Sequence, residues 1–326
     1  MDYNDFKFII ENAVKAPSGH NTQPWLFENI ENGIIIHPDF SRTLPIVDGD
    51  NHALYISLGC ALENILIAAS QLGFESAIQY PNDSGDSIKV TFQINNTFSE
   101  GKKDPLYDYI SSRQVNRGEY SDRKIASHVL QKLKLSFSLP GISLVLLDGR
   151  ESFSNIIPLI IEGNNLQFEN KQFINELTSW FRYSKTEAKR KKDGLWTAAM
   201  GLPNMGKPIG MFVMKNFVSA KSEAKRLGGI LQHTQGLAIF LSEKDDLASW
   251  INTGRAFQRF GLTATQLGIS HAHLYMPCEE LAVRKKLAKK LNMSNLDPLL
   301  VIRYGYSGKV PYSFRRKVDE VILNHQ

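Results

Sequence analysis

The sequence predicts an α+β protein made of two related halves, in which sheets pack on long central helices. Two observations support this prediction. A segment of 25 residues occurs twice, and apolar runs with the character of strands flank both copies. The chain of 326 residues is 42% hydrophobic and 22% charged, as in ordinary globular proteins, and its length suits one large domain or two moderate ones.

The repeat becomes visible when the sequence is shifted by 195 positions. Residues 53–77 (ALYISLGCALENILIAASQLGFESA) then align with residues 248–272 (ASWINTGRAFQRFGLTATQLGISHA). The residues that recur are Ala53, Ile56, Gly59, Ala61, Ala69, Gln71, Leu72, Gly73 and Ala77. Average composition would give about one or two identities by chance, so the repeat indicates a duplicated unit.

Both copies have the periodicity of a helix. Apolar residues of the first copy step by four and three positions and so share one helix face. They are Leu58, Leu62, Ile65, Ala69 and Leu72, and their counterparts are Thr253, Phe257, Phe260, Ala264 and Leu267. Gly73 and Gly268 are expected to end the two helices. Because the first helix is apolar nearly all round, we predict that it is central and pairs with the second in a pseudo-twofold core.

Strands are predicted around each helix. SIKVTFQIN, residues 87–95, alternates apolar and polar side chains, and four shorter apolar runs lie between turn residues. These runs are NGIIIHP (32–38), GISLVLLDG (141–149), QGLAIFLS (235–242) and DPLLVIRYGY (297–306). Residues 153–229, approximately, are helix-like but irregular and have no counterpart in the first half. This stretch is a candidate cover over a site.

Net charge, the N-terminal sequence and the length of the apolar stretches argue against several functions. The net charge of +5 is small, and the basic run KTEAKRKK is typical of a solvated helix face, so nucleic acid is not expected as a partner. The N-terminal MDYNDFKFIIENAV lacks the pattern of a signal peptide, and no stretch was expected to reach the roughly 20 apolar residues of a membrane span. We therefore expect a cytoplasmic protein, no membrane partner and two reduced cysteines.

Several catalytic motifs are absent or incomplete. GLPNMGKP (201–208) has Pro where a nucleotide-binding P-loop needs a hydroxyl, and no G-x-G-x-x-G occurs. His271, His273 and Cys278 are metal-ligand types, but two separated ligand pairs are not visible, so no metal is predicted. Cys60 lies mid-helix among apolar residues, where a thiol is usually an inert part of the core.

Two remaining features suggest a ligand site. The stretch APSGHNTQPW (16–25) is a turn by composition, yet it contains an aromatic residue and many polar groups. Arginines occur in SSRQVNRGEY and near the C-terminus, at Arg113, Arg117, Arg315 and Arg316. Arginine grips phosphate in two-pronged fashion, although surface salt bridges are the more ordinary role for such residues.

These segments together resemble the FMN-dependent nitroreductase family. APSGHNTQPWLF and the helix that begins SLGCALENIL resemble the family signature, and RQVNRGEY resembles its phosphate motif, with Asn116 in the Ser place and Tyr120 near its aromatic. LGISHAHLYMP resembles the segment that passes the reactive edge of the flavin, and VIRYGY with FRR resembles the C-terminal phosphate arm. The resemblance extends from Ala16 to Arg316.

The resemblance implies a nitroreductase-like fold and a set of FMN-binding residues. They are Pro17, Ser18, Gly19, Asn21, Gln23, Arg113, Asn116, Arg117, His273, Leu274, Tyr275, Arg315 and Arg316. Family members are usually homodimers that hold each flavin between subunits. Here the turn lies in one half (1–110) and the Arg motif in the other (111–326, with a candidate lid at about 153–229). The chain therefore resembles the fused, duplicated Acg-type branch, with one flavin site per pseudo-dimeric monomer; further dimerisation stays open.

The implied reaction is electron transfer from NAD(P)H through FMN to a nitro, quinone or other electron-poor acceptor. No catalytic acid or base is identified in the sequence. An alternative is a flavin-binding protein whose closed site sequesters the cofactor with little turnover, because the 153–229 segment would cover the ring.

Overall fold

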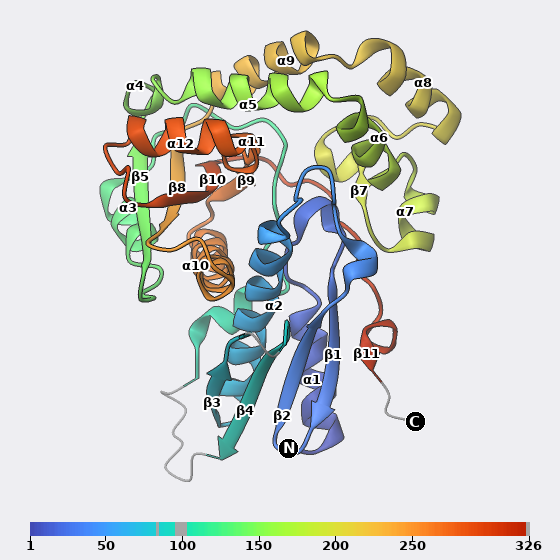
Figure 1. Cartoon of the computed structure of the whole chain (residues 1–326), viewed down its shortest axis with the longest axis vertical. Helices are drawn as coiled ribbons and strands as arrows, with labels where there is room; N and C mark the ends of the chain where they lie inside the picture. Colours follow the sequence, from blue (N-terminus) through green and yellow to red (C-terminus); the bar gives the residue numbers. More distant parts are fainter. Residues whose placement is uncertain (83–84, 95–102, 324–326) are drawn as a thin grey trace.

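The chain forms two sheets on either side of a pair of long helices, with further helices across one end (Figure 1). The computed structural model describes residues 1–82, 85–94 and 103–323. Helix α2 (His52–Gln71) packs on the first sheet and helix α10 (Leu247–Gln266) on the second. The predicted α+β class, with sheets packed on long helices, is confirmed.

The first sheet combines four strands from the N-terminal part of the chain with β11 from near its C-terminal end. Its strand order is β11-β1-β2-β4-β3, and all neighbours are antiparallel except β11 and β1. Helix α1 lies against α2. The bounds are α1 Tyr3–Ala13, β1 Trp25–Ile30, β2 Gly33–Pro38, β3 Phe74–Gln79, β4 Ile88–Ile94 and β11 Ile322–Leu323. Within β4 the predicted alternation holds for Ile88, Val90 and Phe92, which are buried, whereas Ile94, the fourth apolar position, is 74% exposed. Asn95, the predicted last residue, lies outside the described residues.

The second sheet is antiparallel, in the order β5-β8-β10-β9. Every residue of β8 is buried, as its unbroken apolar run predicts. Its strands and the helices near it are β5 Ile142–Asp148, β8 Gly236–Ser242, β9 Ser270–His273, β10 Asp297–Gly305, α3 Ser127–Lys134, α11 Met276–Glu279 and α12 Leu281–Lys290. The predicted strands at 32–38, 141–149, 235–242 and 297–306 are confirmed.

The repeated helices cross at their shared glycines. A Cβ atom on Gly59 would lie 2.0 Å from the carbonyl oxygen of Ile251, and one on Gly254 would lie 2.0 Å from that of Ile56. The two contacts are equivalent under the shift of 195 positions, so the pair is packed symmetrically. Both helices end as predicted, with Gly73 and Gly268 at φ values of 80° and 68°. The predicted pairing of the helices is confirmed.

Helix α2 corrects one sequence-based expectation. It is 20 residues long with a mean hydropathy of 1.6, enough by length and composition to cross a membrane, whereas no such stretch was expected. However, 89% of that window is buried inside the protein. Its apolar character is explained by packing between the first sheet and α10.

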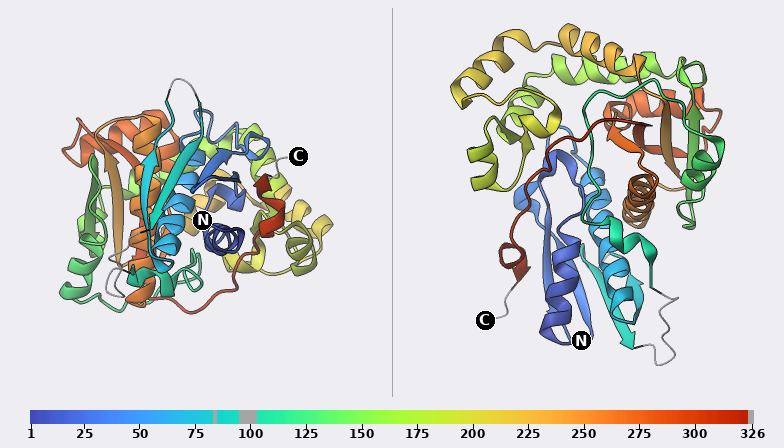
Figure 2. Two further views of the ribbon diagram at one scale, coloured as in Figure 1. Left: turned by 90° about the horizontal axis from the view of Figure 1, so that it is seen from below. Right: turned by 180° about the vertical axis from the view of Figure 1, so that it is seen from behind.

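The stretch from residue 150 to 232 forms a cover of helices across the end of the central pair (Figure 1). Two short strands, β6 and β7, pair in parallel within it. Its elements are α4 Arg150–Phe153, α5 Ile157–Glu169, α6 Lys171–Trp180, β6 Phe181–Arg182, α7 Lys185–Lys191, β7 Leu195–Trp196, α8 Lys207–Phe217 and α9 Ala220–Gln232. After β10, the C-terminal segment runs back past the cover to the first sheet, where β11 pairs with β1 (Figure 2).

Candidate functional site

The turn that follows α1 has an unusual backbone. A short 3₁₀ helix, Gly19–Asn21, contains His20 at φ 45°, and Asn21 and Gln23 have φ values of 56° and 55°. Left-handed backbone is uncommon outside glycine and costs energy, so three such residues within four positions need external support. Part of this support is local, because the backbone N–H of Gln23 donates a hydrogen bond to the Ser18 hydroxyl oxygen at 2.9 Å.

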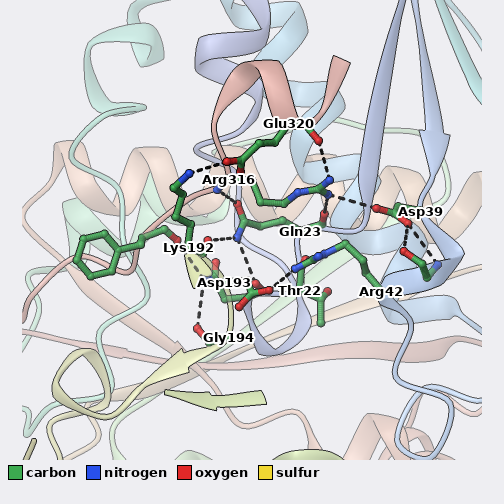
Figure 3. A network of polar contacts seen from close by, with 12 residues as sticks. Thr22, Gln23, Asp39, Arg42, Lys192, Asp193, Gly194, Arg316 and Glu320 are labelled. Carbon is green, nitrogen blue, oxygen red and sulfur yellow. Dashed lines mark hydrogen bonds and ion pairs between the residues drawn. The ribbon is translucent and has the colours of Figure 1, made fainter. Parts of the chain in front are cut away.

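The cover and the C-terminal segment supply the remaining support (Figure 3). The Asn21 side-chain amide donates to the carbonyls of Gly194 (3.2 Å) and Phe314 (3.1 Å). The Gln23 amide group donates to the Lys192 carbonyl at 2.8 Å and accepts from the Arg316 backbone N–H at 2.7 Å. Three segments distant in sequence are thereby fixed to one another around the turn.

A cavity of about 580 Å³ lies between the turn, the start of α2 and the cover. Most of its wall is apolar. Its lining includes Pro17, Ser18 and Gly19 of the turn, Ile56, Ser57 and Cys60 of α2, Phe168, Phe173, Leu177, Tyr183, Val213 and Met214 of the cover, and His273, Leu274 and Tyr275 after α10. The cover therefore forms one side of the cavity, as its position in the sequence led us to expect.

A smaller pocket of about 60 Å³ adjoins the cavity and is rich in arginine. Pro17, Ser18, Arg117 and His273 line both spaces. Arg113 and Arg315 line the smaller pocket, and the buried Arg113 Nε and Nη1 and Arg315 Nε have no hydrogen-bond partner in the described chain. Buried donors in that condition are costly, and an anion in the pocket would satisfy them.

Electrostatics at this junction are strongly cationic. Burial, followed by the charges of Arg303 and Arg226, lowers the pKa of Arg117 to about 10. Burial, followed by Arg113, lowers the pKa of Arg315 to about 9, and burial is the main cause of an Arg113 pKa of about 10. Each guanidinium remains charged at neutral pH. Burial is the largest cause of all three shifts, and no acidic side chain is among the groups that raise these pKa values.

Burial, assisted by the same cations, keeps the nearby imidazoles neutral. Burial and then Arg117 lower the pKa of His20 to about 4, and both causes also depress the pKa of His273 well below its ordinary value. His271 lies two residues before His273 in β9, and burial followed by the charge of Arg113 lowers its pKa to about 3. The positive charge of the site at neutral pH therefore belongs to arginine alone.

The structure divides the predicted site residues into two groups. Ten of them line one or both spaces: Pro17, Ser18, Gly19, Asn21, Arg113, Arg117, His273, Leu274, Tyr275 and Arg315. Gln23, Asn116 and Arg316 line neither, which departs from the prediction. Gln23 is fully buried in the turn, Asn116 donates to the Gly308 carbonyl at 2.7 Å, and Arg316 pairs with Asp39 at 3.3 Å. Their side chains hold the walls together.

Sequence reasoning missed several lining residues. Arg303 lies on β10 with its guanidinium 3.9 Å from the Tyr120 ring centroid, and its Nη1 is buried without a partner in the described chain. A single charge inside the apolar run of β10 was the available signal. His20 was inside the quoted turn, and Tyr183 and Trp196 lie in the stretch that was predicted as a cover but were not named as site residues.

The cavity also has an acidic wall away from the arginines. Glu279 accepts a hydrogen bond from the Gln167 side-chain amide at 2.6 Å, and burial raises its pKa to about 8. Tyr275 lies one helical turn earlier, and its buried hydroxyl has no hydrogen-bond partner among the described residues. At neutral pH this wall presents largely uncharged hydrogen-bonding groups.

One cluster of potential metal ligands occurs in the described residues, outside the predicted site. Asp48, Asp50 and His52 lie before and at the start of α2. The Asp48 carboxylate accepts from the backbone N–H groups of Ala53 (2.8 Å) and Leu54 (2.9 Å), so it caps the helix. His271, His273 and Cys278, which the sequence left as weak candidates, are not part of this cluster.

Comparison with known proteins supports the resemblance to nitroreductases. No protein-family model matches the chain. Two proteins of Mycobacterium tuberculosis, from strains CDC 1551 and H37Rv, carry provisional names as NAD(P)H nitroreductases; each is 20% identical to this chain over 98% of its length and 92% of theirs.

Solved structures with the same kind of name align with part of the chain. An FMN-dependent nitroreductase of Mycobacterium smegmatis, in complex with NADPH, is 13% identical over 67% of this chain and 96% of its own, with a TM-score of 0.42. A Bacteroides fragilis nitroreductase with bound FMN is 14% identical over 68% of this chain and 100% of its own, with a TM-score of 0.38. These scores are low, and the architecture rests on the elements described above.

Proposed function

We propose that the protein is an FMN-dependent oxidoreductase that passes electrons from NAD(P)H to a nitro, quinone or other electron-poor acceptor. The observation that carries the proposal is the arginine-lined pocket next to a large apolar cavity. Arg113 and Arg315 offer unpaired donors, Arg117 adds positive charge, and none of the three forms an ion pair with an acid in the described residues. A phosphate joined to a flat apolar ring system fits both spaces.

The residues present suit FMN in detail. Arg113, Arg117 and Arg315 would hold its phosphate, and the turn from Pro17 to Gly19 would border the ring, because glycine permits close approach of the main chain. When bound, the flavin would supply the hydride and electron transfer chemistry itself. The chain's part is to bind, orient and shield it, with the apolar wall of the cover excluding water.

The two halves and the cover take defined roles in this proposal. Residues 1–110 would form the half that supplies the turn, and residues 111–326 the half that supplies the arginines, as in the fused Acg-type branch. Residues 153–229 would act as the lid. The hydrogen bonds from Asn21 and Gln23 to the cover and to the C-terminal segment support one composite site per chain.

A second candidate function is supported by the cover. Phe173, Leu177, Tyr183 and Met214 all border the cavity from the lid side, and such a lid would restrict access to a nicotinamide. In that case the protein would bind and sequester flavin with little turnover. The two functions share the cofactor and differ in access.

A sequence of two measurements tests the proposal. Visible spectra and acid-released flavin, quantified against protein, should give about one FMN per chain; a ratio near two, or no flavin binding, would contradict the single composite site. The flavin-loaded protein is then mixed with NADH or NADPH and an acceptor such as menadione. Oxidation of the nicotinamide supports the oxidoreductase, whereas stable flavin without oxidation supports the sequestering protein.

A further inference from the structure

Helix α8, at the outer end of the cover, has apolar side chains toward the cavity and others toward solvent. Gly210, Val213 and Met214 border the cavity. Ile209 is 61% exposed, and Phe217, at the C-terminal end of the helix on the same face as Val213 and Met214, is 66% exposed. Large apolar side chains are usually buried, yet these two meet solvent on α8, which lies at the outer end of the cover (Figure 1).

The exposed apolar residues of α8 are clustered within one short segment of the surface. Met211 and Phe212 are also more than half exposed, so four large apolar side chains fall between Ile209 and Phe217. The rings of Phe212 and Phe217 are 6.1 Å apart. Other exposed apolar side chains, such as Tyr3 and Leu135, occur singly, which is normal for a protein surface.

The chain around α8 carries an excess of positive charge. Residues 185–232 contain ten Lys and Arg against three Asp and Glu, a net charge of +7, whereas the whole chain has +5. The remainder is therefore −2. Positive charge is concentrated on the part of the cover that contains α7, α8 and α9.

The acidic residues of that stretch are half-buried and paired. Glu187 lies 3.9 Å from Lys207, Glu223 lies 2.7 Å from Arg226, and Asp193 pairs with Arg182 at 2.7 Å. Basic side chains on both neighbours of α8 are exposed. They are Lys185, Lys189, Arg190 and Lys191 on α7, and Lys221, Lys225 and Arg226 on α9. The exposed charge beside the apolar face is thus positive.

We propose that this surface, the four exposed apolar side chains of α8 with the exposed basic residues of α7 and α9, docks on anionic phospholipid membranes. Apolar side chains at the level of the headgroups and basic side chains toward anionic lipid are the two components of peripheral binding by a helix. The sequence led us to expect no membrane partner because a span was not foreseen. Peripheral docking requires no span.

A second copy of the chain is a poorer occupant of this surface. A twofold interface through α8 would bring two segments of net charge +7 together, and like charges across an interface oppose association. Anionic lipid offers the opposite charge and an apolar layer at once.

Docking has a consequence for the cavity that rests on the proposed function. The inner face of α8 borders the cavity, so an acceptor dissolved in the bilayer would enter past Val213 and Met214. Docking itself requires neither flavin nor turnover, and its test is therefore separate from that of the oxidoreductase.

Co-sedimentation with vesicles tests the proposal on the full chain. We expect binding to vesicles of phosphatidylglycerol mixed with phosphatidylcholine, weak binding to phosphatidylcholine alone, and release as NaCl is raised, because counterions screen the basic residues. Ile209→Ser with Phe217→Ser should weaken binding by about tenfold or more, since two apolar anchors are lost. A matched double variant, Phe40→Ser with Leu135→Ser, changes residues 47% and 72% exposed elsewhere and should bind like wild type.

A charge variant completes the experiment. Replacing Lys189, Arg190 and Lys191 by Gln should reduce binding to anionic vesicles without altering thermal unfolding. Absence of wild-type binding to anionic vesicles, or equal binding by wild type and the Ile209/Phe217 variant, would overturn the proposal. So would a change in sedimentation velocity between those two proteins without a change in vesicle binding, because that result would assign the face of α8 to a protein interface.

Discussion

At the scale of single residues, the distinctive feature of the candidate site is a group of arginines removed from water. Arg113, Arg117, Arg303 and Arg315 form no ion pair with an acid in the part of the chain that the structure describes, and three of them have lowered pKa values that are given above. An unpaired charge removed from water is expensive. A bound anion would offset that cost, so ligand binding and stability should be coupled at this site.

Glu279, which lines the cavity, allows a test at the scale of a single residue. Burial raises its folded pKa to about 8 from an ordinary value of 4.5. Between these values the folded protein holds a proton that the unfolded chain has lost, so the free energy of unfolding should fall as pH rises from about 4.5 to about 8. Glu279→Gln removes the titration and keeps a partner for Gln167.

Urea unfolding of wild type and Glu279→Gln across that range measures the effect. We expect the variant to lose less stability than wild type between about pH 5 and about pH 8. Other titrating groups, including Asp48, are present in both proteins and cancel in the comparison. Parallel curves for the two proteins would show that Glu279 ionises normally in the folded state.

At the scale of elements, the crossing of α2 and α10 depends on two glycines. Gly59→Ala would place a methyl group 2.0 Å from the Ile251 carbonyl oxygen, in backbone that flexible side chains cannot relieve. We expect a loss of about 2–4 kcal/mol in unfolding free energy. Gly229→Ala is the matched control, because Gly229 is in helix α9 with open space around its Cβ position.

Thermal and urea unfolding compare the two variants. Gly229→Ala should be neutral or stabilising by up to about 1 kcal/mol, since Ala has the higher helix propensity. If both substitutions have the same effect, the close approach of the two helices is not a determinant of stability.

Within the cover, α8 packs closely against Tyr183 because Gly210 has no side chain. A Cβ atom on Gly210 would lie 2.0 Å from Cδ1 of Tyr183, so Gly210→Ala should displace α8 from the rest of the cover. Faster limited proteolysis within residues 201–217, with little change in the thermal midpoint of the whole protein, is the expected result. Gly228→Ala, with open space at its Cβ position, serves as the control. Unchanged proteolysis of the Gly210 variant would mean that Tyr183 yields and α8 stays in place.

At the scale of the whole molecule, the helices and strands could be predicted from the sequence wherever the pattern of apolar residues matches the packing. The repeat located α2 and α10, because a glycine and an apolar face had to recur for two helices to cross symmetrically. The alternation in β4 and the apolar runs of β5, β8 and β10 followed from burial on one or both faces. Most of the predicted residues that line the candidate site were named from the resemblance of the turn, the Arg segment and residues 273–275 to nitroreductase motifs.

The remainder depends on contacts that local sequence does not encode. Gln23 and Arg316 have the residue types of a binding site, but they bond to each other across 293 positions and line neither pocket. The left-handed backbone of His20, Asn21 and Gln23 is maintained by the cover and the C-terminal segment, and so had no local signal. Arg303 became part of the site only when β10 was placed beside the Arg117 segment.

Comparative titration of FMN and riboflavin tests the central claim, that the arginine-lined pocket holds a phosphate. The two ligands share the ring, and riboflavin lacks the phosphate. Arg117 lines both spaces, and a charge-assisted bond to phosphate contributes roughly 1.5–3 kcal/mol, against about 0–1 for an exposed pair. Wild type should therefore prefer FMN, and Arg117→Ala should weaken FMN by at least about tenfold while leaving riboflavin nearly unchanged. Equal losses for both flavins, or an unchanged FMN constant, would contradict the claim.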